Sequence, residues 1–316
     1  MKVLITGGAG FIGSHLAKKL LSAKHNVTIA DSFDPYYQPD RKKQQLAEVE
    51  KLNLPFTFLE MDLLEEDNCR KIILDGQFDA IIHLAALPGV PASLLNPARY
   101  IDYDVKMTVN LLKQASEANV GHFLFASSSS VYGNQSGMPL QEDMANGRTA
   151  SPYAAAKAGA EAFCRAYESL YGFKLTILRF FTVYGPWGRP DMAITNFVFN
   201  LLEGKRIKVF DRNSARDYTY IDDIADGINR ALVRPGNSAI YNLGAGSPVS
   251  MQQLLELLEV RFPAMEIEVA GKRPGDVEET WSDITKAQLD LGFFPQVQLE
   301  EGLDLTIQWA KNYLNR

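Results

Sequence analysis

Short apolar runs alternate with amphipathic segments through the first 180 residues. The first run, Lys2–Thr6, precedes a glycine-rich turn and a helical pattern from 14 to about 23. Further apolar runs, each interpreted as a strand, lie at 26–30, 56–60, 80–86, 123–126 and 175–179, with helical patterns between them at 36–54 and 97–117. Fully apolar runs are typical of central strands that are covered on both faces. The alternation predicts an α/β fold, namely a Rossmann-type, doubly wound parallel sheet with right-handed crossovers.

The regular alternation ends near residue 185. A segment rich in Gly and Pro follows at 185–190. Beyond it, helices are predicted at 193–202, 218–232, 251–262, 284–291 and 299–313, and short strands at 207–210 and 267–269. We therefore expect a smaller α/β domain built from two returns of the chain, about 181–216 and 246–316. The larger domain would comprise 1–180 and about 217–245.

Composition narrows the possible function classes. The chain has 316 residues, of which 46% are hydrophobic, and a formal net charge of -6 without a run of Lys or Arg that would create a basic stripe. This balance argues against a non-specific nucleic-acid binder. No apolar run approaches the ~20 residues that a membrane-spanning helix needs. Two cysteines, Cys69 and Cys164, and four scattered histidines lack metal-site spacing. We expect a cytoplasmic protein without a metal site or a membrane segment.

The glycine-rich turn after the first strand favours a dinucleotide phosphate. Gly7, Gly10 and Gly13 allow the backbone to approach a ligand, and a pyrophosphate would lie at the positive end of the following helix. Asp31 ends the second strand, close to the ~20-residue interval at which an acid receives the adenosine ribose. A carboxylate there repels a 2′-phosphate and therefore favours NAD over NADP. A turn-forming aspartate is the alternative interpretation.

A tyrosine and a lysine are spaced to act together at the start of a helix. Ser151 and Pro152 are a suitable N-cap and first helical residue, so Tyr153 and Lys157 share one helix face. A phenol normally loses its proton near pH ~10. An adjacent ammonium and a helix N-terminus both favour the phenolate. Tyr153 is therefore a candidate proton acceptor, although the same spacing also arises by accident.

The serine run 127–130 follows an apolar strand, at the sheet edge where open α/β sheets bind ligands. The segment 133–150 is long enough to fold over such a site. His83 lies inside a fully apolar run, and we interpret it as a core residue rather than as a catalyst.

Together these motifs resemble the extended short-chain dehydrogenase/reductase family over essentially the whole chain. The motifs are Thr6–Gly13 (TGGAGFIG), the serine run before Val131-Tyr132-Gly133, Tyr153-x-x-x-Lys157, Arg216–Asp223 (RDYTYIDD) and Arg273–Val277 (RPGDV). The resemblance implies tightly held NAD, a UDP-sugar substrate and a homodimer paired through two helices per subunit. It also implies that the larger domain binds NAD and the smaller one the nucleotide sugar.

Within the family, residues 179–193 most resemble the UDP-glucuronate 4-epimerases. Tyr153 would then take the proton from the sugar 4-hydroxyl while hydride leaves carbon 4, with Lys157 assisting and Ser128 contacting the same oxygen. The implied cofactor-binding residues are Gly7, Gly10, Phe11, Ile12, Gly13, Asp31, Asp62, Leu63, Ala85, Ala86, Tyr153 and Lys157. The implied substrate-binding residues are Ser128, Ser129, Thr182, Arg189, Val209, Phe210, Arg216, Arg273 and Asp276.

Two of these residues bear on the sugar. Thr182 and Arg189 offer a hydroxyl and a guanidinium fork for a hexuronic carboxylate. Our hypothesis is that this clamp keeps the β-keto-acid intermediate from losing carbon dioxide. The alternatives are 4-epimerisation of UDP-glucose or UDP-N-acetylglucosamine, decarboxylation of UDP-glucuronate, and a non-catalytic NAD-binding sensor. The serine run lacks the acidic pair of the family's dehydratases, which counts against 4,6-dehydration.

Two positions depart from the family pattern. Pro91 stands where uronate epimerases often have arginine, and Asp104 stands where the family usually has asparagine beside the catalytic lysine. A carboxylate at 104 could pair with Lys157. These departures affect the predicted sugar more than the predicted epimerase chemistry.

Overall fold

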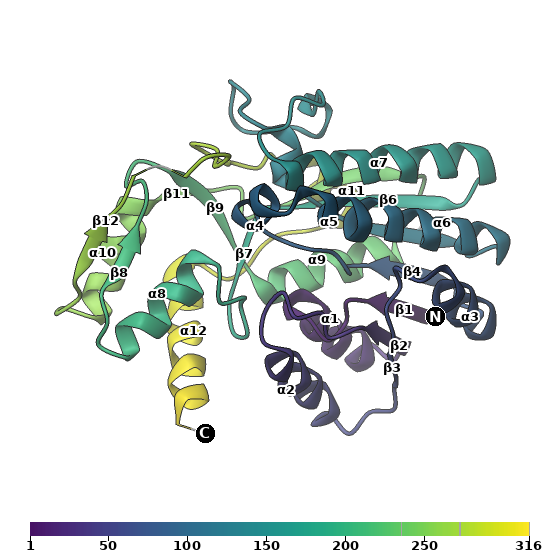
Figure 1. Ribbon diagram of the computed structural model, residues 1–316, viewed down its shortest axis with the longest axis horizontal. Helices are drawn as coiled ribbons and strands as arrows, with labels where there is room; N and C mark the ends of the chain where they lie inside the picture. The colour runs from purple at the N-terminus through teal and green to yellow at the C-terminus, as the bar shows by residue number, and fades with distance from the viewer. Residues whose placement is uncertain (235, 272, 316) are drawn as a thin grey trace.

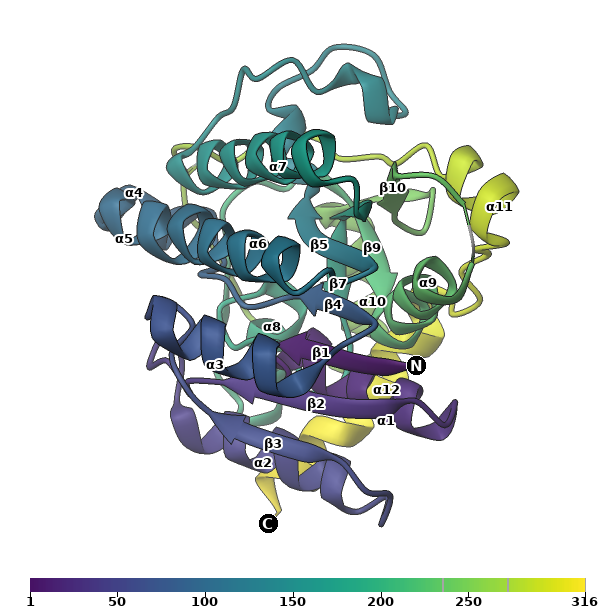
Figure 2. The same ribbon diagram turned by 90° about the vertical axis from the view of Figure 1, so that its right-hand side faces the viewer.

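A computed structural model describes residues 1–234, 236–271 and 273–315 of the chain. A central sheet of seven strands dominates it (Figures 1 and 2). Its strands, in spatial order, are β3 (Thr57–Glu60), β2 (Asn26–Asp31), β1 (Lys2–Thr6), β4 (Ala80–His83), β5 (His122–Ser128), β6 (Lys174–Phe180) and β10 (Ala239–Leu243). Every neighbouring pair is parallel. The order reverses between β1 and β4, which is where ligands bind in doubly wound sheets.

Helices cover both faces of this sheet, as Figure 2 shows. One layer consists of α3 (Glu66–Gly76), α6 (Met107–Glu117) and α7 (Pro152–Tyr171), and the other contains α1 (Phe11–Ser22) and α9 (Ile221–Val233), with α2 (Pro39–Glu50) packed on α1. Within β1, Val3 and Ile5 join the core on the α1 side, whereas Leu4 joins the core under α3 and α6. Because both faces are buried, the strands read as continuous apolar runs. The predicted fold class is confirmed.

The remaining elements form a smaller lobe at one end of the molecule (Figure 1). Strands β7 (Thr182–Tyr184), β9 (Ala215–Tyr220) and β11 (Pro248–Ser250) make a three-stranded sheet, and β8 (Ile207–Val209) pairs in parallel with β12 (Ile267–Val269). The helices of this part are α8 (Ala193–Leu202), α10 (Met251–Arg261) and α12 (Leu299–Leu314), whereas α11 (Thr285–Leu291) packs against β10 and α9 of the larger unit (Figure 2). The domain limits expected from the sequence stay a prediction.

The predicted helix at 218–232 is wrong in its first turn. Residues Ala215–Tyr220 are strand β9, and the helix begins only at Ile221. Tyr218 and Tyr220 pair with Thr182 and Tyr184 of β7. Polar Asp217 can be buried in this strand because its carboxylate accepts hydrogen bonds from the backbone N–H groups of Ala245, Gly246 and Ser282. A buried strand with satisfied polar side chains lacks the apolar signal of its neighbours.

The predicted helix at 97–117 is divided into three parts. The segment comprises α5 (Pro97–Tyr100), a π-helical turn η1 (Ile101–Lys106) and α6. The pattern reading did not identify α3, β7, β10, β11 or the short helix α4 (Val90–Leu95), which precedes α5. Among the described residues, no helix is both long and apolar enough to cross a membrane.

Candidate functional site

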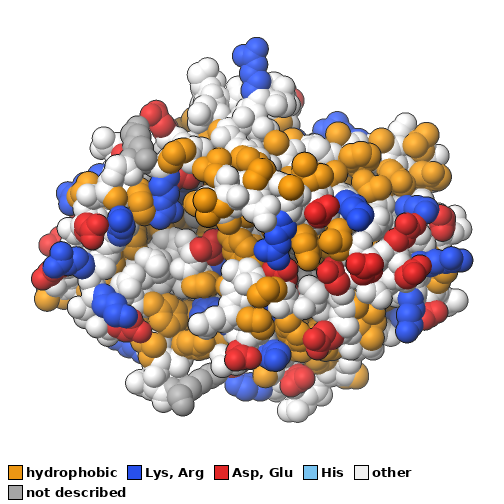
Figure 3. All heavy atoms as spheres, in the orientation of Figure 1, with side chains coloured by type: hydrophobic (Ala, Val, Ile, Leu, Met, Phe, Trp, Pro, Cys, Tyr) orange, Lys and Arg blue, Asp and Glu red, His pale blue; other side chains and the backbone are white. Residues whose placement is uncertain are grey.

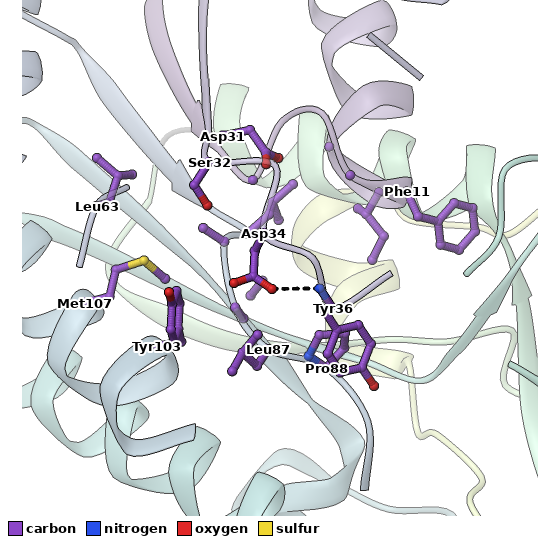
Figure 4. A pocket seen from close by; sticks show the side chains of 18 of the residues that line it. Phe11, Asp31, Ser32, Asp34, Tyr36, Leu63, Leu87, Pro88, Tyr103 and Met107 are labelled. Carbon is purple, nitrogen blue, oxygen red and sulfur yellow. Dashed lines mark hydrogen bonds between the residues drawn. The ribbon is translucent and has the colours of Figure 1, made fainter. Parts of the chain in front are cut away.

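A pocket opens at the carboxyl ends of β1, β2 and β4, where the strand order reverses. Every residue that the sequence predicted to bind the cofactor lines this pocket, together with Arg189. The fold thus gathers side chains from the first, second and fourth strands and from α7 at one place. Figure 4 shows the pocket from close by, with Asp31 and Ser32 at the end of β2 and with Leu63, Tyr103 and Met107 together on another wall.

The glycine turn forms one wall of the pocket. At two of its positions the neighbouring backbone leaves no room for a side chain. Gly7 has a φ of +68°, and a Cβ at this position would lie 2.7 Å from the backbone nitrogen of Ala85. A Cβ at Gly13 would overlap the carbonyl oxygen of Gly7 and lie 2.5 Å from the Cα of Gly8. The N-cap of α1 is Gly10, which supplies no side-chain acceptor to the first backbone N–H groups. These N–H groups can therefore receive an anion.

Asp31 is buried at the end of β2. Its carboxylate accepts hydrogen bonds from the backbone N–H of Ala9 (3.1 Å) and of Phe33 (2.9 Å). Lys42 Nζ lies 3.8 Å from Oδ1. Burial raises the pKa of Asp31 above its usual range, and Lys42 acts in the opposite direction. The sequence reading did not single out Lys42, because no motif links a residue of α2 to the end of β2.

The opposite wall joins the end of β3 to helix α6. Asp62 accepts a hydrogen bond from the backbone N–H of Leu64 (2.9 Å), and the hydroxyl of Tyr103 donates to its other oxygen (3.4 Å). Tyr103 and Met107 complete this wall, although nothing in the sequence pattern identified either residue. Asp34 lies between the two walls, where its carboxylate accepts from the backbone N–H of Tyr36 (2.9 Å; Figure 4).

Tyr153 and Lys157 lie on the face of α7 that borders the pocket. Ser151 caps this helix, because its Oγ accepts from the backbone N–H of Ala154 (3.2 Å). Lys157 is buried, and its Nζ donates to the carbonyl oxygen of Ala126 (3.1 Å) and lies 3.2 Å from Oδ1 of Asp104. The ammonium is thus held in place by the end of β5 and by η1.

The serine run lies beside the pocket, but its members differ in their contacts. Ser127 lines the pocket and donates to the buried carboxylate of Glu161. Ser128 caps the short helix η2 (Ser129–Tyr132), accepting from the backbone N–H of Ser130 at 3.2 Å. Ser128, Ser129 and Thr182 do not line the pocket, so their predicted contacts with substrate stay predictions.

Arg189 reaches the pocket already paired. Its Nε and Nη2 donate to the two carboxylate oxygens of Asp191 at 3.0 and 2.9 Å, and the Tyr36 hydroxyl donates to Oδ2 of Asp191 at 3.4 Å. Burial opposes the charge of Arg189, yet Asp191 raises the pKa of this guanidinium above its usual range. Burial likewise opposes the charge of Asp191, and Arg189 lowers the pKa of that carboxyl. Both charges therefore persist at neutral pH.

The other predicted substrate residues belong to the smaller lobe and do not line this pocket. The guanidinium carbon of Arg273 lies 3.4 Å from the ring centroid of Phe210, which follows β8. Arg216 donates to the backbone carbonyls of Ala215 (2.8 Å), Val277 (2.8 Å) and Glu278 (3.1 Å). The fold thus brings the 273–278 loop beside the ends of β8 and β9, and Val209 and Asp276 lie in the same region.

Comparison with known proteins identifies the family. Residues 3–244 match the NAD dependent epimerase/dehydratase family. The chain belongs to this family. A UDP-glucuronate 4-epimerase from Thermodesulfobacterium geofontis is 40% identical over 311 residues, which cover 98% of this chain and 95% of that protein.

Solved structures of this epimerase family share the whole fold. The structure of UDP-glucuronic acid 4-epimerase from Bacillus cereus in complex with UDP-glucuronic acid and NAD has a TM-score of 0.92 and 34% identity, covering 99% of this chain and 100% of that one. The structure of UDP-glucose 4-epimerase with UDP-glucose from Thermotoga maritima has a TM-score of 0.91 and 30% identity, with the same coverage.

NAD is the cofactor of this epimerase family, and the pocket fits it. The space that a Cβ would fill at Gly7 and Gly13 admits a pyrophosphate close to the backbone. The buried carboxylate of Asp31 lies where an adenosine ribose can bind. The chain is accordingly an NAD-dependent enzyme of the epimerase type. Among the described residues, no group of His, Cys, Asp and Glu side chains is arranged to hold a metal ion.

Proposed function

We propose that this enzyme interconverts UDP-glucuronate and UDP-galacturonate by epimerisation at carbon 4, with Tyr153 as the base. The observation that carries this proposal is the combination, in one pocket, of the Tyr153 and Lys157 pair with the guanidinium of Arg189. Tyr153 and Lys157 are suited to removing a proton from a sugar hydroxyl, and the guanidinium of Arg189 is suited to binding a carboxylate. The relative from T. geofontis and the structure from B. cereus support the same assignment.

The side chains divide the work between binding and proton transfer. When bound, NAD supplies the hydride chemistry that no side chain provides. Tyr153 takes the proton of the sugar 4-hydroxyl and later returns it. Lys157, held by Ala126 and Asp104, places a positive charge beside the phenol that favours the phenolate and can donate to a ribose hydroxyl. Ser128 would share the reacting oxygen.

The sugar carboxylate is assigned to Thr182 and Arg189. Nε and Nη2 of Arg189 donate to Asp191, and no hydrogen bond donated by Nη1 is found among the described residues. The uronate would therefore bind at Nη1, while Asp191 and Tyr36 fix the plane of the guanidinium. A carboxylate held in this way is kept from aligning its C–C bond for decarboxylation. Arg216, Arg273 and Asp276 of the smaller lobe remain our candidates for the UDP moiety.

Product analysis tests the proposal. The purified holoenzyme is incubated with UDP-glucuronate and the nucleotide sugars are separated. UDP-galacturonate is the expected product, whereas UDP-xylose would indicate a decarboxylase. Conversion of UDP-glucose or UDP-N-acetylglucosamine with no conversion of UDP-glucuronate would move the assignment to another sugar. Undiminished epimerisation by Tyr153→Phe would refute the proposed base.

A homodimer and a cytoplasmic location belong to the same proposal. Hydrophobic side chains gather over α6 and α7 on the face shown in Figure 3. Large apolar side chains around these helices are exposed, notably Ile101 (60%), Phe163 (43%) and Leu170 (72%). A patch of this kind is typical of a protein interface. A second copy of the chain is its proposed occupant, with the two helices of each subunit packed together.

A further inference from the structure

Asp104 is a buried carboxylate that acts on the site through Lys157 rather than by lining the pocket itself. Asp104 lies in η1, the π-helical turn between α5 and α6. π-Helical turns are rare and occur frequently at functional sites. The residue is 0% exposed, so its side chain depends entirely on protein groups for stabilisation.

Lys157 is the cation that stabilises Asp104. Oδ1 lies 3.2 Å from Nζ, and the side chains of Lys157 and Asp104 are 5% and 0% exposed. The backbone N–H of Leu87 also approaches the carboxylate and, like Lys157, opposes the rise in pKa that burial causes at Asp104. Removing either partner would leave the other charge in the interior without its counter-ion. The two residues form a pair of opposite charges, and Tyr153 is one helical turn from Lys157 on α7.

The backbone of η1 is fixed in this position by a chain of hydrogen bonds. Thr108 Oγ1 donates to the carbonyl oxygen of Asp104 (2.6 Å) and also bonds to Nε2 of His83 (3.0 Å), whose Nδ1 bonds to Thr6 Oγ1 (2.7 Å). Thr6 and His83 belong to β1 and β4. The backbone of Asp104 is thus linked by hydrogen bonds to the central strands β1 and β4.

Two titratable groups beside Asp104, His83 and Tyr100, are neutral at physiological pH, whereas Arg189 in the same pocket as Tyr153 keeps its charge. Burial lowers the pKa of His83 on β4 to about 3. On α5, burial raises the pKa of Tyr100 far above its usual range. For Asp104 itself, burial raises the pKa to about 6, while Lys157 acts in the opposite direction. Above that pH, Asp104 is negatively charged and opposes the charge of Lys157.

We infer that Asp104 is a positioning residue, which holds Lys157 beside Tyr153 and offsets part of its positive charge, so that it sets the pH range in which Tyr153 accepts a proton. This inference rests on the proposed role of Tyr153 as the base. An unopposed ammonium favours the phenolate more strongly than an ammonium paired with a carboxylate. The uncharged, isosteric Asp104→Asn must therefore let Tyr153 work as a base at lower pH than the wild type does.

The test compares holoenzymes that carry Asp104 or Asp104→Asn. Tyrosinate formation is followed by ultraviolet difference titration, with the Tyr153→Phe form of each protein subtracted. The Tyr153 midpoint in Asp104→Asn is expected to be lower by about one pH unit. The low-pH limb of the pH–rate profile should move by the same amount. Asp102→Asn is the matched control, because Asp102 belongs to the same π-helical turn but is exposed.

Three outcomes decide the inference. A lower midpoint in Asp104→Asn, together with a wild-type midpoint in the charge-retaining Asp104→Glu, supports it. Equal midpoints in Asp104→Asn and the wild type, or an equal shift in Asp102→Asn, overturn it. Should Asp104→Asn not fold, Asp104→Ser removes the same charge and takes its place in the titration. The titration needs no sugar, so a wrong substrate assignment would leave its result unaffected.

Discussion

At the scale of single residues, the site is organised by charges that are paired before any ligand binds. Arg189 is paired with Asp191, Lys157 with Asp104, and Lys42 approaches Asp31. Each pair is at least partly buried, and losing one partner leaves an uncompensated charge. The sugar preference should therefore depend on which of these pairs still offers a free donor to the substrate.

Arg189→Ala tests the proposed carboxylate contact. We expect UDP-glucuronate binding to weaken by about 2–5 kcal/mol, because a partly buried charged contact is lost. UDP-glucose binding should weaken much less, since that sugar has no carboxylate. Isothermal titration calorimetry of the holoenzyme with both nucleotides measures the difference. Arg206→Ala is the control, because the Arg206 side chain is 67% exposed. Equal losses for the two sugars would assign Arg189 a purely structural role.

His122→Gln tests the contribution of a buried neutral histidine to stability. His122 is buried and bonds to Thr176 Oγ1 (2.9 Å), and burial lowers its pKa from 6.5 to about 3. The unfolded chain therefore binds a proton before the native state does, so the stabilisation is complete above pH 6.5 and is lost as the pH falls towards 3.

The wild type should consequently lose about 1.4 kcal/mol more per pH unit than His122→Gln does in this range. Urea denaturation at about pH 5.5 and about pH 4.5 measures both slopes. Parallel slopes would show that His122 is protonated equally in the folded and unfolded states.

At the scale of elements, the pocket depends on two backbone features that bring charged groups close together. The glycine turn allows the chain after β1 to approach the backbone just after β4, and the π-helical turn η1 places Asp104 beside Lys157 of α7. An ordinary α-helical continuation from α5 to α6 would change the direction of the side chains in this segment. Both are features of the backbone conformation. A single substitution that the conformation does not accommodate can therefore disrupt either of them.

Gly13→Ala tests the glycine turn. Its Cβ would overlap the carbonyl oxygen of Gly7, which forces the turn to open. Such a distortion costs about 1–3 kcal/mol. NAD affinity should fall by roughly ten- to a hundredfold, because the pyrophosphate site is distorted. Equilibrium dialysis with NAD measures the loss. Gly236→Ala is the control, since a Cβ there meets open space. Unchanged affinity in Gly13→Ala would exclude the turn as the phosphate site.

At the scale of the whole molecule, the two helix layers have different environments. The α1 layer packs against the smaller lobe and α2, whereas the α6 and α7 layer presents apolar side chains on its outer surface (Figure 3). This asymmetry leads us to place the subunit contact on α6 and α7.

A charged double variant tests the proposed dimer. Ile101→Glu with Phe163→Glu places two carboxylates on the exposed apolar surface, and burying them in an interface would be costly. We expect the molar mass from light scattering to fall from that of a dimer to that of a monomer. Val260→Glu on α10 is the control, because this residue is 78% exposed outside the proposed contact. A dimeric double variant would place the interface elsewhere.

The sequence by itself determined the fold class and the cofactor pocket. Strand, glycine turn and helix occur within a few residues of one another, so Gly7, Gly13 and Asp31 could be recognised from local spacing. The same holds for Tyr153 and Lys157, because one helical turn places them on the same face. Their common pocket follows from the parallel order of the strands.

The tertiary structure decided which charges meet, although the family resemblance already suggested that a carboxylate at position 104 could pair with Lys157. Asp104 and Lys157 are 53 positions apart in the sequence and pair only because η1 packs against α7. In the same way, β10 joins the sheet beside β6 although about sixty residues separate them. Strand β9 looked helical because a buried aspartate replaced the expected apolar residue. Periodicity reports local burial, whereas the pairing of distant charges depends on packing between elements that are far apart along the chain.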